Sequence, residues 1–122
     1  MPSRLVLVVD DDTDNRESLI ELLTMEGYEA VGAKNGLDAL QFLEKCERLP
    51  SVLLIDLMMP EMDGVALCQA CAGTQRLSSI PRIIVSGKRD FDLAACQAHT
   101  FVTKPVSPAR ILTAVGDVLM PQ

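Results

Sequence analysis

The chain alternates between two kinds of apolar pattern. Short runs rich in Val, Ile and Leu, with few polar interruptions, are typical of strands buried on both faces of a parallel sheet. The most apolar runs lie at residues 4–10 and 51–57, and the weakest lies at 28–33. With two further runs they predict five strands, over residues 4–10, 28–33, 51–57, 81–87 and 100–104.

Longer segments between these runs carry apolar residues at helical spacing. They predict five helices, over residues 14–27, 36–46, 64–73, 91–98 and 107–119. We expect Asp14 to cap the first helix, because Glu17 follows it at capping-box spacing. Ser107 is the expected cap of the last helix, where Pro108 takes the first helical position. Strands that alternate with helices through short connections predict an α/β fold, a doubly wound parallel sheet with helices on both faces.

Composition and charge narrow the possible functions. The chain has 122 residues, which suits a single domain over residues 1–122, and 48% of them are hydrophobic, enough for a sizeable core. A formal charge of −6, from 17 acidic and 11 basic residues, argues against a nucleic-acid surface. Neither a signal-peptide pattern nor an apolar run of membrane-spanning length is present, so we expect a cytoplasmic protein. Its four cysteines are expected to be packed or half-packed thiols: Cys46, Cys68, Cys71 and Cys96.

Polar residues suited to metal and phosphate chemistry end four of the predicted strands. In open α/β sheets, ligands bind at the carboxyl ends of the strands. Three carboxylates at that edge would form a hard-oxygen site for Mg²⁺. Asp56 ends the most apolar strand and is the expected nucleophile, which would form an aspartyl phosphate. An amine and a hydroxyl could contact the phosphoryl oxygens. The five converging residues are Asp10, Asp11, Asp56, Ser86 and Lys104.

The motifs around these residues resemble those of response-regulator receiver domains in two-component signalling. The stretches VVDDD, LLIDLMMPEMDG, IIVSG and FVTKP occur in the family's order, and the resemblance covers essentially the whole chain. It implies a flavodoxin-like fold with strand order 2-1-3-4-5. It also implies a phosphoprotein that receives a phosphoryl group from a phosphohistidine and then changes conformation to control a partner.

The resemblance also implies a role for each site residue. Asp56 would be the phosphoacceptor. Mg²⁺ or Mn²⁺ would be held by three carboxylates and one main-chain carbonyl, those of Asp10, Asp11, Asp56 and Met58. Ser86 and Lys104 would contact the phosphoryl group, and Phe101 would turn inward in concert with Ser86. Asp12 is left without a family role, and we expect it to add to the local negative field and to help shape the loop.

Three departures from the family pattern concern the switch surface. The interval from Ser86 to Lys104 is shorter than usual by about one helical turn, which predicts a short fourth helix. Gln97 and Ala98 replace a common Gly-Ala pair, and Phe101 lacks the hydroxyl of a Tyr. We expect these departures to leave the phosphorylation chemistry unchanged. The face made by the fourth helix, fifth strand and fifth helix, which could form a homodimer or dock a partner, is where the output could differ.

The sequence around the acid cluster excludes two other interpretations of it. A haloacid-dehalogenase-type phosphohydrolase would place its nucleophile on the first strand and would need a cap region. An EF-hand loop would need Gly where Asn15 stands, and a helix where a strand precedes it.

One alternative stays open. The chain could be a degenerate receiver that serves as a phosphorylation-independent interaction module. On the main interpretation it is no free-standing enzyme. Its partners would be a sensor histidine kinase or a histidine phosphotransfer protein, and an unknown downstream protein.

Overall fold

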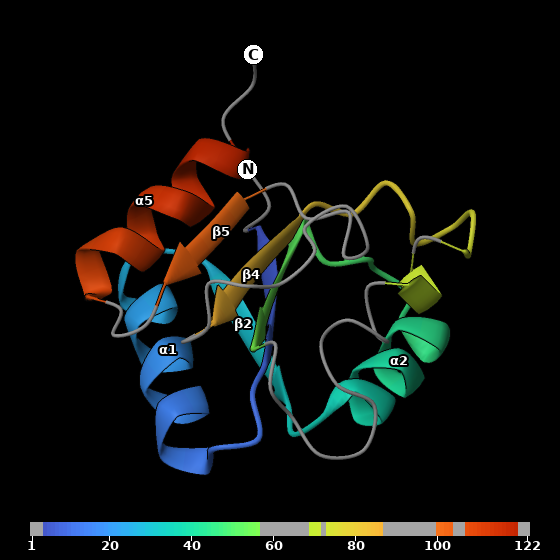
Figure 1. The fold of residues 1–122 in the computed structure, drawn as a ribbon, viewed down its shortest axis with the longest axis horizontal. Helices are drawn as coiled ribbons and strands as arrows, with labels where there is room; N and C mark the ends of the chain where they lie inside the picture. Colours follow the sequence, from blue (N-terminus) through green and yellow to red (C-terminus); the bar gives the residue numbers. More distant parts are fainter. Residues whose placement is uncertain (1–3, 57–68, 72, 87–99, 104–106, 120–122) are drawn as a thin grey trace.

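The computed structural model describes residues 4–56, 69–71, 73–86, 100–103 and 107–119. Its strands are β1 (Leu5–Val9), β2 (Glu29–Ala33), β3 (Val52–Asp56), β4 (Arg82–Ser86) and β5 (Thr100–Thr103). These pair in parallel in one five-stranded sheet with the order β2-β1-β3-β4-β5 (Figure 1). The predicted parallel α/β architecture is therefore confirmed.

The apolar pattern of each strand matches its place in the sheet. The central strands β1 and β3 are buried at every position, as uninterrupted apolar runs predict. β2 lies at the edge, where Ala33 is buried and its other residues are exposed or partly exposed. In register, Val9 pairs with Ile55 and Asp56 pairs with Val85. This register brings the carboxyl ends of the central strands to one edge of the sheet.

Helices cover both faces of the sheet. The helices α1 (Thr13–Met25) and α5 (Pro108–Leu119) lie on one face, and α2 (Gly36–Lys45) lies on the other (Figure 1). Alternate strand residues point to opposite faces, so the strands contribute to two cores. The core on the α1 and α5 side contains Val6, Val8, Leu23, Val52, Leu54, Ile83, Val85, Ile111 and Val115. The core on the α2 side contains Leu7, Val9, Ala33, Ala39, Leu43, Leu53, Ile55, Cys71, Leu77, Ile80 and Ile84.

The start of α1 differs from the sequence prediction. Asp12 is the N-cap, because its carboxylate accepts a hydrogen bond from the Asn15 N–H at 3.0 Å. The prediction that Asp14 caps this helix is wrong. Asp14 lies inside the first turn, where its negative charge interacts favourably with the helix dipole and stabilises the helix. At the other end, Gly27 takes a φ of 94° just beyond α1, as expected of the predicted stop.

The last helix begins as predicted: the Arg110 N–H donates to Ser107 Oγ at 3.3 Å, ahead of α5. Of the predicted helix 64–73, residues 69–71 are described as helical. The predicted helix at 91–98, including its expected shortening, lies outside the described residues. Within the described ranges, no helix combines the length and the apolar character that crossing a bilayer requires.

Candidate functional site

Three acidic side chains meet at the carboxyl edge of the sheet. Asp10 and Asp11 are the first two residues of the loop between β1 and α1, and Asp56 is the last residue of β3. One carboxylate oxygen of each lies within 4.8 Å of the other two. Asp10 and Asp56 are only 4% and 6% exposed, whereas Asp11 is open to solvent. Two buried like charges at this spacing are unfavourable unless donors or a cation offset them.

Hydrogen bonds fix Asp10 in this cluster. Its Oδ1 accepts from the Asp12 N–H at 2.9 Å, and its Oδ2 accepts from Asn15 Nδ2 at 2.8 Å. The main chain of Asp10 is held as well, since its N–H donates to the Ala33 carbonyl at 3.1 Å and its carbonyl accepts from Arg16 at 2.8 Å. The loop between β1 and α1 is thus built around one buried carboxylate.

The remaining acids of the Asp-rich stretch have separate places. Asp12 caps α1, and Asp14 lies in the first turn of that helix. Neither belongs to the group of carboxylates that could share a metal ion. The acids of this stretch therefore serve two places: some belong to the carboxylate cluster that could bind a metal ion, and the others lie at the start of α1. Asp12 shapes the loop, as expected, through both its N–H and its carboxylate.

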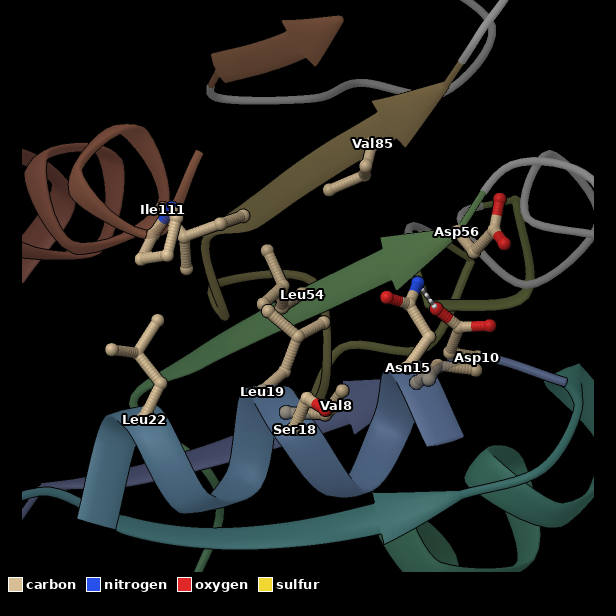
Figure 2. Close-up of a pocket in the computed structure, with 12 residues that line it drawn as sticks. Val8, Asp10, Asn15, Ser18, Leu19, Leu22, Leu54, Asp56, Val85 and Ile111 are labelled. Carbon is tan, nitrogen blue, oxygen red and sulfur yellow. Dashed lines mark hydrogen bonds between the residues drawn. The ribbon is translucent and has the colours of Figure 1, made fainter. Parts of the chain in front are cut away.

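Asp56 reaches the cluster from the centre of the sheet. It ends a strand whose other residues are all buried and apolar, and it pairs in register with Val85 of β4. Figure 2 shows the Asp56 side chain at the end of β3, near Asp10 and Asn15. β3 lies between β1 and β4; its register with β1 extends to Ile55, and Asp56 itself pairs with β4.

An apolar pocket adjoins the acids. It has a volume of about 650 Å³ and lies beside α1, over the face of the sheet that α5 also covers (Figure 2). Asp10, Asn15 and Asp56 lie at one end of it. Apolar walls beside charged groups reduce the local dielectric and strengthen electrostatic interactions at the site. The lining residues are Val8, Val9, Asp10, Asn15, Ser18, Leu19, Leu22, Leu54, Asp56, Val85, Pro108 and Ile111.

The other predicted site residues are described in part or not at all. Ser86 is the last residue of β4 and pairs with Thr103, the last residue of β5. Phe101 lies within β5, opposite Ile84. The side chains of Ser86 and Phe101, and the whole of Met58 and Lys104, lie outside the described part of the structure.

The donor set fits a divalent cation. Mg²⁺ and Mn²⁺ prefer hard oxygen ligands, and three carboxylates within 4.8 Å offer them. Mg²⁺ characteristically binds one or two protein carboxylates and keeps several waters. The exposed Asp11 gives the site an open side where water or a phosphoryl oxygen could enter.

Asn15 is a site residue that the sequence did not single out. Its side chain donates to Asp10 from the first turn of α1. The available signal was its position, five residues after Asp10 and three after Asp12, the residue that proves to be the helix cap. The sequence pattern placed the N-cap at Asp14. It therefore did not predict the helical turn from which the Asn15 side chain reaches the acid cluster.

Comparisons with known proteins point to one family. The family model described as the response regulator receiver domain matches residues 6–116. The chain is 32% identical over 123 residues to the transcriptional regulatory protein GltR of Pseudomonas aeruginosa, a match that covers 95% of this chain and 49% of that protein. An uncharacterized 14.6 kDa protein in the sodA1 3′ region of Leptolyngbya boryana is 36% identical, with 90% of this chain and 86% of that protein covered. The chain spans about half the length of the curated transcriptional regulators that it matches.

Solved structures give the same result. The signal receiver domain of a signal transduction histidine kinase from Syntrophus aciditrophicus superposes with a TM-score of 0.87 and 32% identity, covering 96% of this chain and 90% of that one. The chemotaxis protein CheY4 of Vibrio cholerae gives a TM-score of 0.89 and 25% identity, covering 97% of this chain and 100% of that one.

Proposed function

We propose a phosphoryl-accepting role in two-component signalling for this chain, which belongs to the response regulator receiver domain family. The observation that carries the proposal is the cluster of Asp10, Asp11 and Asp56, whose carboxylate oxygens lie within 4.8 Å of one another. An isolated carboxylate at a strand end could be a solvated polar residue. Three together, two of them buried, support a metal-binding or catalytic site at this edge of the sheet.

Asp56 is the proposed phosphoacceptor. One of its carboxylate oxygens attacks the phosphorus of a phosphohistidine on a donor protein. The P–N bond breaks, its electron pair returns to the imidazole nitrogen, and an acyl phosphate forms on Asp56. Attack of water on phosphorus later releases inorganic phosphate and restores the carboxylate. The chain assists these two steps on itself and is not a free-standing enzyme with a substrate of its own.

Asp10, Asp11 and Asp56 would hold Mg²⁺ or Mn²⁺, together with the main-chain carbonyl of Met58. A bound divalent ion would offset the repulsion between the carboxylates and the incoming phosphoryl oxygens. The protein's own contribution is to fix Asp10 through two hydrogen bonds and to set Asp56 at the end of a rigid central strand.

The proposed switch uses residues at the ends of β4 and β5. Ser86 and Lys104 would contact the phosphoryl oxygens, as a hydroxyl donor and a compact positive charge. Phe101 would move with Ser86. The new dianionic group would draw these residues toward Asp56, and the neighbouring loops would repack.

The proposed partners follow from this chemistry. A sensor histidine kinase or a histidine phosphotransfer protein would supply the phosphoryl group in the cytoplasm, and a downstream protein would sense the phosphorylated state. The face made by β5, α5 and the predicted fourth helix could bind that protein or a second copy of the chain. We propose neither direct nucleic-acid binding nor membrane binding, and residues 1–122 would act as a single receiver domain.

A small phosphodonor tests the proposal directly. We expect acetyl phosphate with Mg²⁺ to add one phosphoryl group to the wild-type chain, seen by intact-protein mass spectrometry, and hydroxylamine to remove it because it cleaves acyl phosphates. Asp56→Asn should give no adduct. Asp14→Asn is the matched control, since it removes the same charge outside the cluster and should be phosphorylated normally. No adduct on the wild type at any donor concentration would favour a degenerate receiver.

A further inference from the structure

Asn15 extends from the first turn of α1 into the acid cluster. Its Nδ2 donates to Asp10 Oδ2 at 2.8 Å, and it lines the apolar pocket together with Asp10 and Asp56 (Figure 2). It is an uncharged donor beside three carboxylates. A neutral amide cannot supply the positive charge of a metal ion, but its hydrogen bond can determine the orientation of the Asp10 carboxylate.

The turn that carries Asn15 is itself fixed. The Asn15 N–H donates to the carboxylate of Asp12 at 3.0 Å, and the neighbouring Arg16 donates to the Asp10 carbonyl at 2.8 Å. The Asn15 side chain therefore starts from a backbone anchored at the helix cap. Its bond to Asp10 links that anchored backbone to the carboxylate.

Two donors from the described residues contact different oxygens of Asp10. The Asp12 N–H bonds to Oδ1, and Asn15 bonds to Oδ2. Together they oppose rotation of the carboxylate about its Cβ–Cγ bond. Two donors on opposite oxygens define its plane.

We propose that Asn15 is a positioning residue that holds Asp10 in the orientation required to bind a divalent cation. The inference rests on the proposed function, because it concerns the same metal site. Asn15 acts through Asp10, and it contacts neither the cation nor the phosphoryl group. Partners of this kind, which orient a ligand by hydrogen bonding, typically contribute about 10- to 100-fold to metal affinity.

Leucine is the informative replacement. Asn15→Leu keeps a similar side-chain size, removes the donor, and places an apolar group beside the apolar pocket. Removing the donor to the buried Asp10 carboxylate lowers stability, and Leu, as the better helix former, offsets part of that loss. We expect Mn²⁺ affinity, measured by electron paramagnetic resonance of the free ion, to fall about tenfold. The measurement is made where each variant is folded, so that a loss of stability alone leaves the affinity unchanged.

Two further variants define the effect. Asn15→Gln keeps an amide donor on a longer side chain and should bind Mn²⁺ more tightly than Asn15→Leu. Ser18→Ala is the matched control, because Ser18 lines the same pocket from the same helix, and it should bind Mn²⁺ like the wild type. As a second measurement, the Mg²⁺ concentration that half-saturates phosphorylation by acetyl phosphate should rise about tenfold in Asn15→Leu, with the rate at saturating Mg²⁺ largely retained.

The outcomes separate this inference from the proposed function. If the wild type binds Mn²⁺ and Asn15→Leu binds it equally well, the positioning role is wrong and the metal site stands. If the wild type binds no Mn²⁺, the metal site is wrong and the role of Asn15 is overturned with it. Mn²⁺ affinity in Asn15→Gln that is no higher than in Asn15→Leu would also contradict the positioning role.

Discussion

Gly32 of β2 gives α1 the space to approach the sheet. A Cβ added at Gly32 would lie 2.9 Å from Arg16 Cδ and 3.0 Å from Ile20 Cδ1, so both side chains would have to shift. Arg16 is also the donor to the Asp10 carbonyl. We expect Gly32→Ala to lower the free energy of unfolding by about 1 kcal/mol, measured by urea denaturation.

A second glycine serves as the control for that substitution. Gly116 lies inside α5, and a Cβ there would meet nothing within 4 Å. Gly116→Ala should therefore stabilise the chain by about 0.5–1 kcal/mol, because Ala is the better helix former. If Gly32→Ala were also stabilising, the close packing of α1 on β2 would be contradicted.

Cys71 should make stability depend on alkaline pH. Its thiol is fully buried in the α2-side core, and burial raises its pKa, an effect that the nearby Arg82 guanidinium partly offsets. Above about pH 8.5 the unfolded chain releases the thiol proton while the folded chain retains it. The unfolded state then binds fewer protons, so the free energy of unfolding falls as pH rises, and the full contribution is present only below that pH.

Urea denaturation at a series of alkaline pH values measures this slope. We expect the wild type to lose stability with rising pH more steeply than Cys71→Ala. Leu77→Ala, which also truncates a buried side chain of the same core, is the control and should keep the wild-type slope at lower overall stability. Identical slopes for the wild type and Cys71→Ala would contradict the predicted pH dependence.

At the scale of elements, the start of α1 separates two neighbouring acids by function. Asp12→Ala removes the side chain that accepts from the Asn15 N–H, and should cost about 1 kcal/mol of unfolding free energy. Asp14→Ala removes only a favourable charge in the first turn, and should cost about 0.3 kcal/mol. Chemical denaturation of both variants distinguishes the two, and a larger loss for Asp14→Ala would contradict the assignment of the cap.

The helices and strands also show which features of the fold could be predicted from the sequence. The central strands β1 and β3 were predictable because strands buried on both faces need no alternation of polar residues. The clustering of Asp10 and Asp56 followed from parallel topology, which brings distant strand ends together. The N-cap of α1 could not be predicted from the sequence, because Asp12 and Asp14 are both residues that can cap a helix there. A local contact within the loop decides between them, because the Asp10 carboxylate accepts the Asp12 N–H and so fixes the turn.

At the scale of the whole molecule, we expect the acid cluster to lower the stability of the chain when no cation is bound. The chain has a formal charge of −6, and three of its carboxylates share one small region of the sheet edge, two of them buried. The unfolded chain separates these charges, whereas the folded chain holds them together. The proposed function therefore carries a cost in stability when no divalent ion is present.

This cost predicts a reversal of stability between the wild type and Asp56→Asn. With EDTA, Asp56→Asn should be more stable by about 1 kcal/mol, because one of the three clustered charges is removed. With Mg²⁺ at about 100 times its dissociation constant, the wild type should gain about 2.7 kcal/mol and become the more stable of the two, since Asp56→Asn has lost one ligand. Urea denaturation at matched ionic strength measures both conditions. Asp14→Asn changes the net charge equally but lies outside the cluster, so it should follow the wild type in both. If Mg²⁺ stabilises Asp56→Asn as much as the wild type, Asp56 does not bind the ion, and the three carboxylates do not form one metal site.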